Sequence, residues 1–420
     1  MSNSFREELL EIMKQIRTID CHSHTTLKRD YYKNKYNLFN LMSYYERDIN
    51  STTGKGLGQL CADAKSDAER WEIFKSVIER THNVSYWRHN VVMYREVFDM
   101  REDDVMDSNW EKLNETIKQK TSDPDWYHFV TKNISKLATQ VRNIPWFEDW
   151  EPEYFTAVLR MESALQLHDS NTRSSLEKHL NKSFDNIKSL KQGLADLVEE
   201  YRKQGSIGIK LAHAYGRTLY SENVSEHTAN NVFNKALVGM ELTHEEIKQL
   251  QDHIIFFLAG LAGELNLVFQ IHTGVQGNWG NIPDSDPLHL IPLLKANAST
   301  KFDLFHAGYP YSRQIGMLGK HYPNVWLNMC WMYVITMEGS RQSLNEWLDL
   351  VPGERILGFG SDVGTPEFIY AHLVMARSCI ADVLAQKVER DFLSKKVAID
   401  LVYKMFRNNA IKLYGLNNDI

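Results

Sequence analysis

Ile19-Asp20-Cys21-His22-Ser23-His24 is the stretch on which the predicted fold depends. It changes from apolar to polar residues over six positions, which is typical of a β-strand that ends in functional side chains. Alternate side chains of a strand lie on the same face, so His22 and His24 are expected to point the same way, close enough to bind one cation. An H-x-H pair alone is a weak signal, because two ordinary surface or hydrogen-bonded histidines produce the same pattern more often.

Three later strand-like runs end in residues of the same chemical kind. Their sequences are Gln-Ile-His-Thr-Gly at 270–274, Asp-Leu-Phe-His-Ala-Gly at 303–308 and Gly-Phe-Gly-Ser-Asp at 358–362. They supply His272, His306 and Asp362. Any one of these residues could be a satisfied polar group at a strand end, but four matches in order are hard to obtain by chance, so we expect one shared site.

The rest of the chain predicts an alternation of strands and helices. Strands are expected at 19–24, 136–141, 156–161, 206–211, 267–272, 302–306, 325–329 and 355–360, and helices at 5–16, 184–204, 245–265, 288–296, 311–321, 340–350 and throughout 366–413. About eight strands in a βα alternation indicate the α/β class and a (β/α)8 TIM-type barrel.

A mostly helical insertion is predicted after the first strand, over residues 28–133. This part is rich in aromatic and charged residues, and its segments 67–81 and 110–121 have helical spacing of apolar residues. We therefore expect residues 1–420 to form a single barrel that carries the insertion 28–133 within it. A glycine-rich loop at 54–58 is only weak evidence for phosphate binding.

Composition limits the classes of partner. The chain has 420 residues, 43% of them hydrophobic, and a net charge of −6, so neither nucleic acid nor an anionic membrane is an expected partner. A small-molecule substrate and a homo-oligomer are expected. The four cysteines lack C-x-x-C spacing and are expected to be reduced. The N-terminus has no basic segment followed by an apolar core, and no apolar run approaches a membrane span, which predicts a cytoplasmic protein.

The mouth of such a barrel collects residues from the C-terminal ends of the strands. Imidazole nitrogens with one carboxylate suit Zn²⁺, with Mn²⁺ or Fe²⁺ as substitutes. We predict that His22, His24 and His272 hold this divalent metal, that Asp362 contacts it and accepts a proton from water, and that His306 polarises the substrate or protonates its leaving group.

Lys210 ends another strand and is less easily assigned. It could be carboxylated and bridge a second metal, stay cationic and bind a substrate carboxylate, or simply extend from a strand end. Arg160, Tyr215 and Arg217 are further candidates for binding an anionic substrate, with structural salt bridges as an equal alternative for the arginines.

The order of these residues resembles the amidohydrolase superfamily, in particular its amidohydrolase-related group. The segments 158–162, 210–217, 270–274, 286–290 and 306–310 resemble the N-terminal hydrolase-like half of FluG-type glutamine-synthetase fusion proteins. This resemblance implies a (β/α)8 barrel, metal ligation by His22, His24, His272 and Asp362, and a catalytic His306. The segments 83–90 and 94–98 are similar to the helical insertion of uronate isomerases.

Three classes of function remain open on this basis. The first is a metal-dependent hydrolase that cleaves an amide, lactone or ester bond of a small, carboxylated substrate. The alternative is an aldose–ketose isomerase like the uronate isomerases, or a non-oxidative decarboxylase. The third is a metal-binding barrel without catalytic activity.

Overall fold

Eight parallel strands form the framework of the chain. They are neighbours in the order β1 to β8, and the registers from β3 to β8 are all parallel. Their bounds are β1 Thr18–Ser23, β2 Leu137–Ile144, β3 Phe155–Arg160, β4 Gly208–Leu211, β5 Val268–Ile271, β6 Lys301–Leu304, β7 Val325–Asn328 and β8 Ile356–Leu357.

The segment that follows β8 returns to β1. The backbone N–H of Cys21 donates to the carbonyl of Phe359 at 3.1 Å, and the N–H of Asp362 donates to the carbonyl of His22 at 2.9 Å. The sheet therefore forms a nearly closed barrel, and the predicted (β/α)8 fold is confirmed.

The computed structural model describes residues 2–42, 44–277 and 280–418. The chain divides into two compact units. Unit 1 comprises residues 1–140, 330–345 and 358–407, and unit 2 comprises residues 141–329, 346–357 and 408–420.

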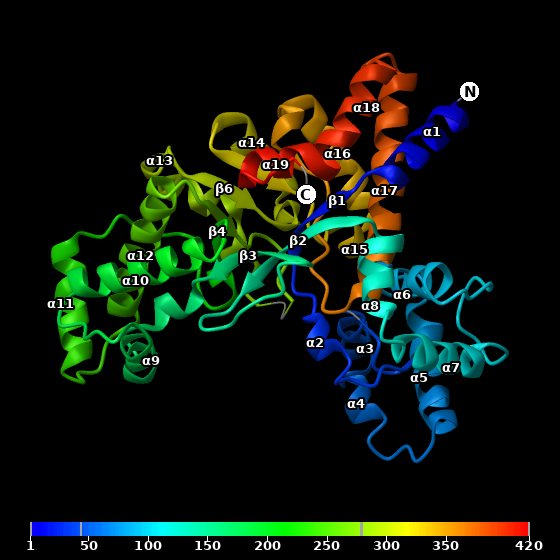
Figure 1. The fold of residues 1–420 in the computed structure, drawn as a ribbon, viewed down its shortest axis with the longest axis horizontal. Coiled ribbons are helices and arrows are strands. Elements are labelled where there is room, and N and C mark those ends of the chain that lie inside the picture. The colour runs from blue at the N-terminus through cyan, green and yellow to red at the C-terminus, as the bar shows by residue number, and fades with distance from the viewer. Residues whose placement is uncertain (1, 43, 278–279, 419–420) are drawn as a thin grey trace. The chain divides into compact units, whose positions relative to one another are not determined.

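Unit 1 contains the N-terminal helix, the helices after β1 and a long helix after β8. Helix α1 (Ser2–Gln15) and α6 (Ser85–Glu96) both pack against α17 (Pro366–Glu389), as Figure 1 shows. The others are α2 Lys28–Tyr31, α3 Glu46–Thr53, α4 Leu57–Leu60, α5 Asp67–Thr81, α7 Trp110–Thr121, α8 Trp126–His128, α15 Met332–Ile335 and α18 Lys395–Tyr403, with π-helical turns at Phe129–Ile134 and Lys404–Asn408.

Helix α17 is long and apolar enough to cross a membrane by composition. However, 78% of its apolar window is buried within the protein. Its buried face includes Phe368, Leu373 and Cys379. This burial is the pattern of a core helix.

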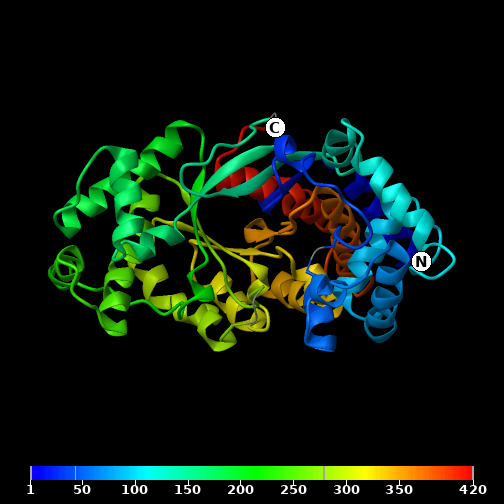
Figure 2. The ribbon, with the colours of Figure 1, turned by 90° about the horizontal axis from the view of Figure 1, so that it is seen from below.

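Unit 2 contains a group of helices between β3 and β5 in the chain. Helix α10 (Ile187–Lys203) packs against α11 (Glu226–Leu237), which packs against α12 (His244–Glu264); they are the green helices in Figure 2. Capping boxes begin two of them, Asn186 with Ser189 on α10 and Thr243 with Glu246 on α12. Also in this unit are α9 Ser170–Leu180, α13 Ile291–Ala296, α14 Ser312–His321 and α19 Asn409–Tyr414, while α16 Met337–Leu350 runs from unit 1 into unit 2.

Three details of the predicted element map are wrong. The C-terminal region is not helical throughout 366–413, because α17 ends at Glu389, Asp391 takes a positive φ of 55°, and Ser394 caps a new helix. The eighth strand has only two residues, although the backbone beyond it continues the pairing. Helices α9 and α11 were not predicted; both are short and rich in polar residues, so their apolar faces are narrow.

A polar network lies inside the barrel in unit 2. Asp303 is completely buried and accepts hydrogen bonds from Tyr414 at 2.5 Å and from Asn328 at 3.1 Å. Gln270 donates to the Tyr414 hydroxyl at 2.9 Å and accepts from Asn143 at 3.1 Å. Burial raises the pKa of the Asp303 carboxyl to about 7, despite these bonds.

This raised pKa predicts how stability depends on pH. The folded protein binds the Asp303 proton more tightly than the unfolded chain, whose carboxyl has a pKa near 3.8. The resulting stabilisation is complete below about pH 4 and is lost as the pH rises through about 7, by an amount on the order of a few kcal/mol. Urea unfolding between those pH values should show a falling midpoint in the wild type and a flatter one in Asp303→Asn. An equal fall of the urea midpoint with pH in both proteins would contradict the raised pKa of Asp303.

Candidate functional site

Three predicted metal ligands meet in unit 1. The Nε2 atoms of His22 and His24 lie 3.1 and 3.3 Å from Oδ1 of Asp362, and the two imidazole rings are 4.7 Å apart in an edge-to-face arrangement. One potential ligand atom from each residue lies within 4.8 Å of the others. His22 is buried, whereas the His24 side chain is 39% exposed, so the cluster has one side open to solvent.

The donor set and its spacing fit a divalent cation. Two imidazoles and a carboxylate form one of the donor sets that Zn²⁺, Fe²⁺ and Mn²⁺ accept. Two ligands at roughly 2.0–2.1 Å from a tetrahedral ion are about 3.3 Å apart, close to the observed separations of 3.1 and 3.3 Å. These three residues would therefore need little movement to bind one ion.

A pair of histidines lies in unit 2, where β5 and β6 end. Nε2 of His306 is 2.9 Å from Nδ1 of His272, and Nε2 of His272 is 2.8 Å from the carbonyl of Val275. Because a carbonyl only accepts, His272 carries its proton on Nε2 and accepts from His306 through Nδ1. Coordination by His272 in this tautomer requires His306 to move from Nδ1, and the ligand role of His272 stays a prediction.

The turn that carries His306 has an unusual backbone. His306, Ala307 and Gly308 have successive positive φ angles of 60°, 51° and 59°. The backbone of Gly274, with φ of 70°, lies so close to this turn that a Cβ atom there would be 2.4 Å from the carbonyl carbon of Gly308. The loops after β5 and β6, which carry His272 and His306, thus require a glycine where they touch.

Lys210 lies on β4 in unit 2. Its side chain is buried, its ammonium is 4.0 Å from the ring centroid of Phe305, and it donates to Asn143 at 3.4 Å. A cation over an aromatic face is a favourable arrangement at a buried site.

The three remaining candidates have different surroundings. Tyr215 lies with its ring 4.8 Å from that of His272. Arg160 donates to Glu162 at 3.2 Å and is 39% exposed. Arg217 is largely buried and forms an ion pair with Asp252 of α12 at 2.5 Å. This pair supports the structural alternative for Arg217, whereas Tyr215 and Arg160 remain predicted contacts of substrate.

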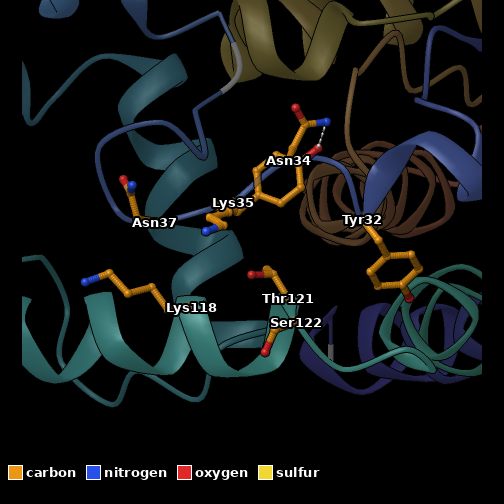
Figure 3. A pocket seen from close by; sticks show the side chains of 8 residues that line it. Tyr32, Asn34, Lys35, Asn37, Lys118, Thr121 and Ser122 are labelled. Carbon is orange, nitrogen blue, oxygen red and sulfur yellow. Dashed lines mark hydrogen bonds between the residues drawn. The ribbon is translucent and has the colours of Figure 1, made fainter.

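A separate cavity of 560 Å³ lies in the insertion, between the segment after α2 and the end of α7. Lys35, Lys118 and Asn37 extend toward one end of it and Tyr32 lies at the other (Figure 3). The Lys118 ammonium already contacts two carboxylates, and the hydroxyls of Thr121 and Ser122 donate to carbonyls of their own helix. None of the predicted site residues lines this cavity.

Two residues near the ligand cluster were not predicted as part of the site. Asp20 directly precedes the H-x-H pair, and His372 lies on α17; both are fully buried. Asp20 could have been noticed because an acidic residue inside an apolar strand needs a partner. His372 lies in a long helical pattern where nothing in the sequence indicates a link to the site.

Comparisons with known proteins agree with the predicted resemblance. The amidohydrolase family model matches residues 245–416. The FluG protein of Emericella nidulans is 29% identical over 153 residues, which cover 36% of this chain and 18% of that protein. A uronate isomerase of Nostoc punctiforme is 24% identical over 263 residues, which cover 58% of this chain and 55% of that enzyme.

A solved structure extends the likeness to the whole fold. Uronate isomerase from Thermotoga maritima matches with a TM-score of 0.81 and 16% identity, over 98% of this chain and 97% of that one. At this identity the likeness shows the fold alone. In sequence, the chain spans about half the length of the Nostoc enzyme and less than a fifth of FluG. The predicted resemblance to the amidohydrolase superfamily, FluG and the uronate isomerases is confirmed.

The cluster of His22, His24 and Asp362 predicts metal binding that depends on the histidine pair. Purified protein should carry a divalent metal, Zn²⁺ being our first expectation, and the double variant His22→Ala/His24→Ala should lose it, because two of the donors are gone. Elemental analysis measures this loss. The matched control is His244→Ala, at an exposed residue that begins α12. An unchanged metal content in the double variant would rule out the assignment.

Gly274 predicts a large effect on stability. In Gly274→Ala the added methyl group would clash with the backbone of Gly308. A left-handed alanine alone lowers the free energy of unfolding by roughly 1–2 kcal/mol, and the clash should lower it by about 1–3 kcal/mol more. Gly54→Ala is the matched control, because its φ is 73° and no atom lies within 4 Å of its added Cβ. Urea denaturation should show the larger loss at Gly274, and similar losses at both positions would contradict the close approach.

Proposed function

We propose that this chain is a metal-dependent isomerase that interconverts the aldose and ketose forms of a uronate. The observation that carries the proposal is the alignment with the Nostoc uronate isomerase, 24% identical over 263 residues. The likeness of fold to a uronate isomerase structure over 98% of the chain, which includes the helical insertion, supports it. The hydrolase function that we first expected from the site residues is not confirmed by these relatives.

The reaction requires modest chemistry from the protein. In an aldose–ketose isomerisation a proton leaves C2 and is returned to C1, while the hydroxyl proton moves from O2 to O1, so no group is released. A divalent cation held by His22, His24, His272 and Asp362 would supply Lewis-acid polarisation of the substrate oxygens. We assign the carbon-to-carbon proton transfer to Asp362, and assistance to a substrate oxygen to His306.

Cationic groups would hold the substrate's carboxylate. Lys210 and Arg160 are our candidates, since a lysine acts as a point charge and an arginine can bind a carboxylate with two donors. Tyr215 would add a hydroxyl. In this proposal Lys210 stays cationic, so one metal per chain is expected.

Hydrolysis is the second candidate, because the family model that matches residues 245–416 is that of amidohydrolases. The same donor set can activate water for attack on an amide or lactone. The two candidates differ in what a substrate must contain, because hydrolysis needs a leaving group and isomerisation needs a hydroxyl beside a carbonyl.

A substrate panel separates these functions. The holoenzyme should convert glucuronate or galacturonate to the ketose, detected by NMR, and in D₂O the ketose should carry deuterium at C1 if the transferred proton exchanges with solvent. N-acyl amino acids, γ-glutamyl amides and lactones should remain intact. The His22→Ala/His24→Ala variant is the negative control. Release of an amine or acid would favour hydrolysis, release of CO₂ a decarboxylase, and bound metal without any turnover a non-catalytic barrel.

His306 provides a second test of the reaction class. His306→Asn should retain the metal and reduce kcat by about 10²–10⁴-fold, the usual value of general acid–base assistance. On a uronate the reduction should not depend on any leaving group, because none departs. If hydrolysis is the true reaction, the loss should shrink for substrates with good leaving groups. Loss of metal from His306→Asn, measured by elemental analysis, would instead make His306 a ligand.

A further inference from the structure

The peptide units around Ser361 connect β8 to the ligand Asp362, and their hydrogen-bonding groups are held by two buried side chains. The N–H of Ser361 donates to Oδ1 of Asp20 at 2.7 Å. The carbonyl of Ser361 is 3.2 Å from Nδ1 of His372. Both side chains have no solvent exposure, so neither contact competes with water.

Asp20 connects the two backbones that carry the ligands. The same Oδ1 atom that accepts from Ser361 also lies 3.3 Å from the N–H of His22. A single carboxylate oxygen therefore contacts both the strand that carries His22 and His24 and the segment that carries Asp362.

His372, on α17, holds the next peptide unit, which joins Ser361 to Asp362. Its ring lies 5.2 Å from Phe359, 5.6 Å from Trp331 and 5.6 Å from Tyr333, which restrict its orientation. Because a carbonyl only accepts, Nδ1 of His372 carries the hydrogen. Burial keeps the pKa of His372 well below its usual value, so the ring is neutral and this tautomer persists.

The position that these contacts determine is a strained one. Asp362 has a φ of 54°, a left-handed conformation that costs a non-glycine residue roughly 1–2 kcal/mol. Its own N–H donates to the carbonyl of His22 at 2.9 Å. If the preceding peptide were released, Asp362 could relax to an ordinary conformation and its carboxylate would turn away from His22 and His24.

We propose that Asp20 and His372 are positioning residues that clamp the two peptide units flanking Ser361 and thereby hold the Asp362 carboxylate in place for the divalent cation. The inference rests on the metal site of the proposed function, but it does not depend on which reaction follows. Outer-shell residues of this kind typically change metal affinity by about 10–100-fold.

Matched pairs of variants test the clamp. His372→Asn keeps an N–H donor near the place of Nδ1, whereas His372→Gln moves it to the place of Nε2 and loses the bond to Ser361. Asp20→Asn keeps the accepting oxygen, whereas Asp20→Leu has a similar shape and no acceptor. Tyr45→Phe is the control for general destabilisation, because it removes a buried bond of 2.6 Å to Thr81 elsewhere in unit 1.

The readouts are the dissociation constant for Zn²⁺, from competition with a chelator, and the absorption spectrum of the Co²⁺-substituted protein. His372→Gln and Asp20→Leu should bind Zn²⁺ about 10–100-fold more weakly and change the Co²⁺ spectrum. The two asparagine variants should stay within about threefold of wild type. Tyr45→Phe should lower thermal stability and leave both metal readouts unchanged. The double variant Asp20→Leu/His372→Gln should lose less affinity than the product of the single effects, because the two residues hold adjacent peptide units of one segment.

Several results would overturn the clamp. A wild-type Zn²⁺ affinity and Co²⁺ spectrum in His372→Gln would do so. Equal losses of Zn²⁺ affinity in the two asparagine variants and in His372→Gln and Asp20→Leu would do so as well. If Asp20→Leu does not fold, the comparison of His372→Asn with His372→Gln tests the clamp by itself. Both of these variants place a polar amide at the buried position and differ in where its N–H lies. A wild-type protein that binds no Zn²⁺ would remove both the metal site and the clamp. A protein that binds Zn²⁺ but does not isomerise uronates would refute the proposed function and leave the clamp supported by the affinities.

Discussion

The return of the backbone beyond β8 to β1 is the constraint on which the site depends. Two hydrogen bonds make this contact, from Cys21 to Phe359 and from Asp362 to His22. They bring together residues about 340 positions apart in the sequence. Because adjacent strands are about 4.8 Å apart, side chains at their ends are at the right distance to share one ion. The histidine pair and the aspartate therefore form one cluster without contributions from any long loop.

The neighbouring backbone is arranged so that Asp362 cannot easily leave this cluster. Gly358 donates to the carbonyl of Met405, Trp331 donates to Gly360, and the groups of Ser361 bond to Asp20 and His372. A Cβ atom at Gly360 would lie 2.9 Å from that of Cys330, so the segment is also held by close packing. Strain at Asp362 is thus balanced by many contacts, as expected where a site has to be preorganised.

The choice between hydrolysis and isomerisation illustrates what a metal site does and does not specify. A divalent cation held by His22, His24 and Asp362 would polarise a carbonyl oxygen in either reaction. What differs is the shape and charge of the space that receives the substrate and whether water reaches the reacting carbon. The likeness to a uronate isomerase structure, at 16% identity, concerns the fold alone, so the reaction is decided by the residues that line this space.

The sequence by itself predicted the alternation of strands and helices and placed His22, His24 and Asp362 at strand ends, because both features depend on local periodicity. The contact between β1 and the segment after β8, which brings these three residues together, came from the tertiary structure. It also indicated the H-x-H pair, whose spacing of two places both rings on one face. Only the tertiary structure identified Asp20 and His372 as partners of Ser361, and the ion pair that commits Arg217 to Asp252. These contacts join residues from distant parts of the chain, and no periodic pattern encodes which buried polar group will meet which backbone group once the elements have packed.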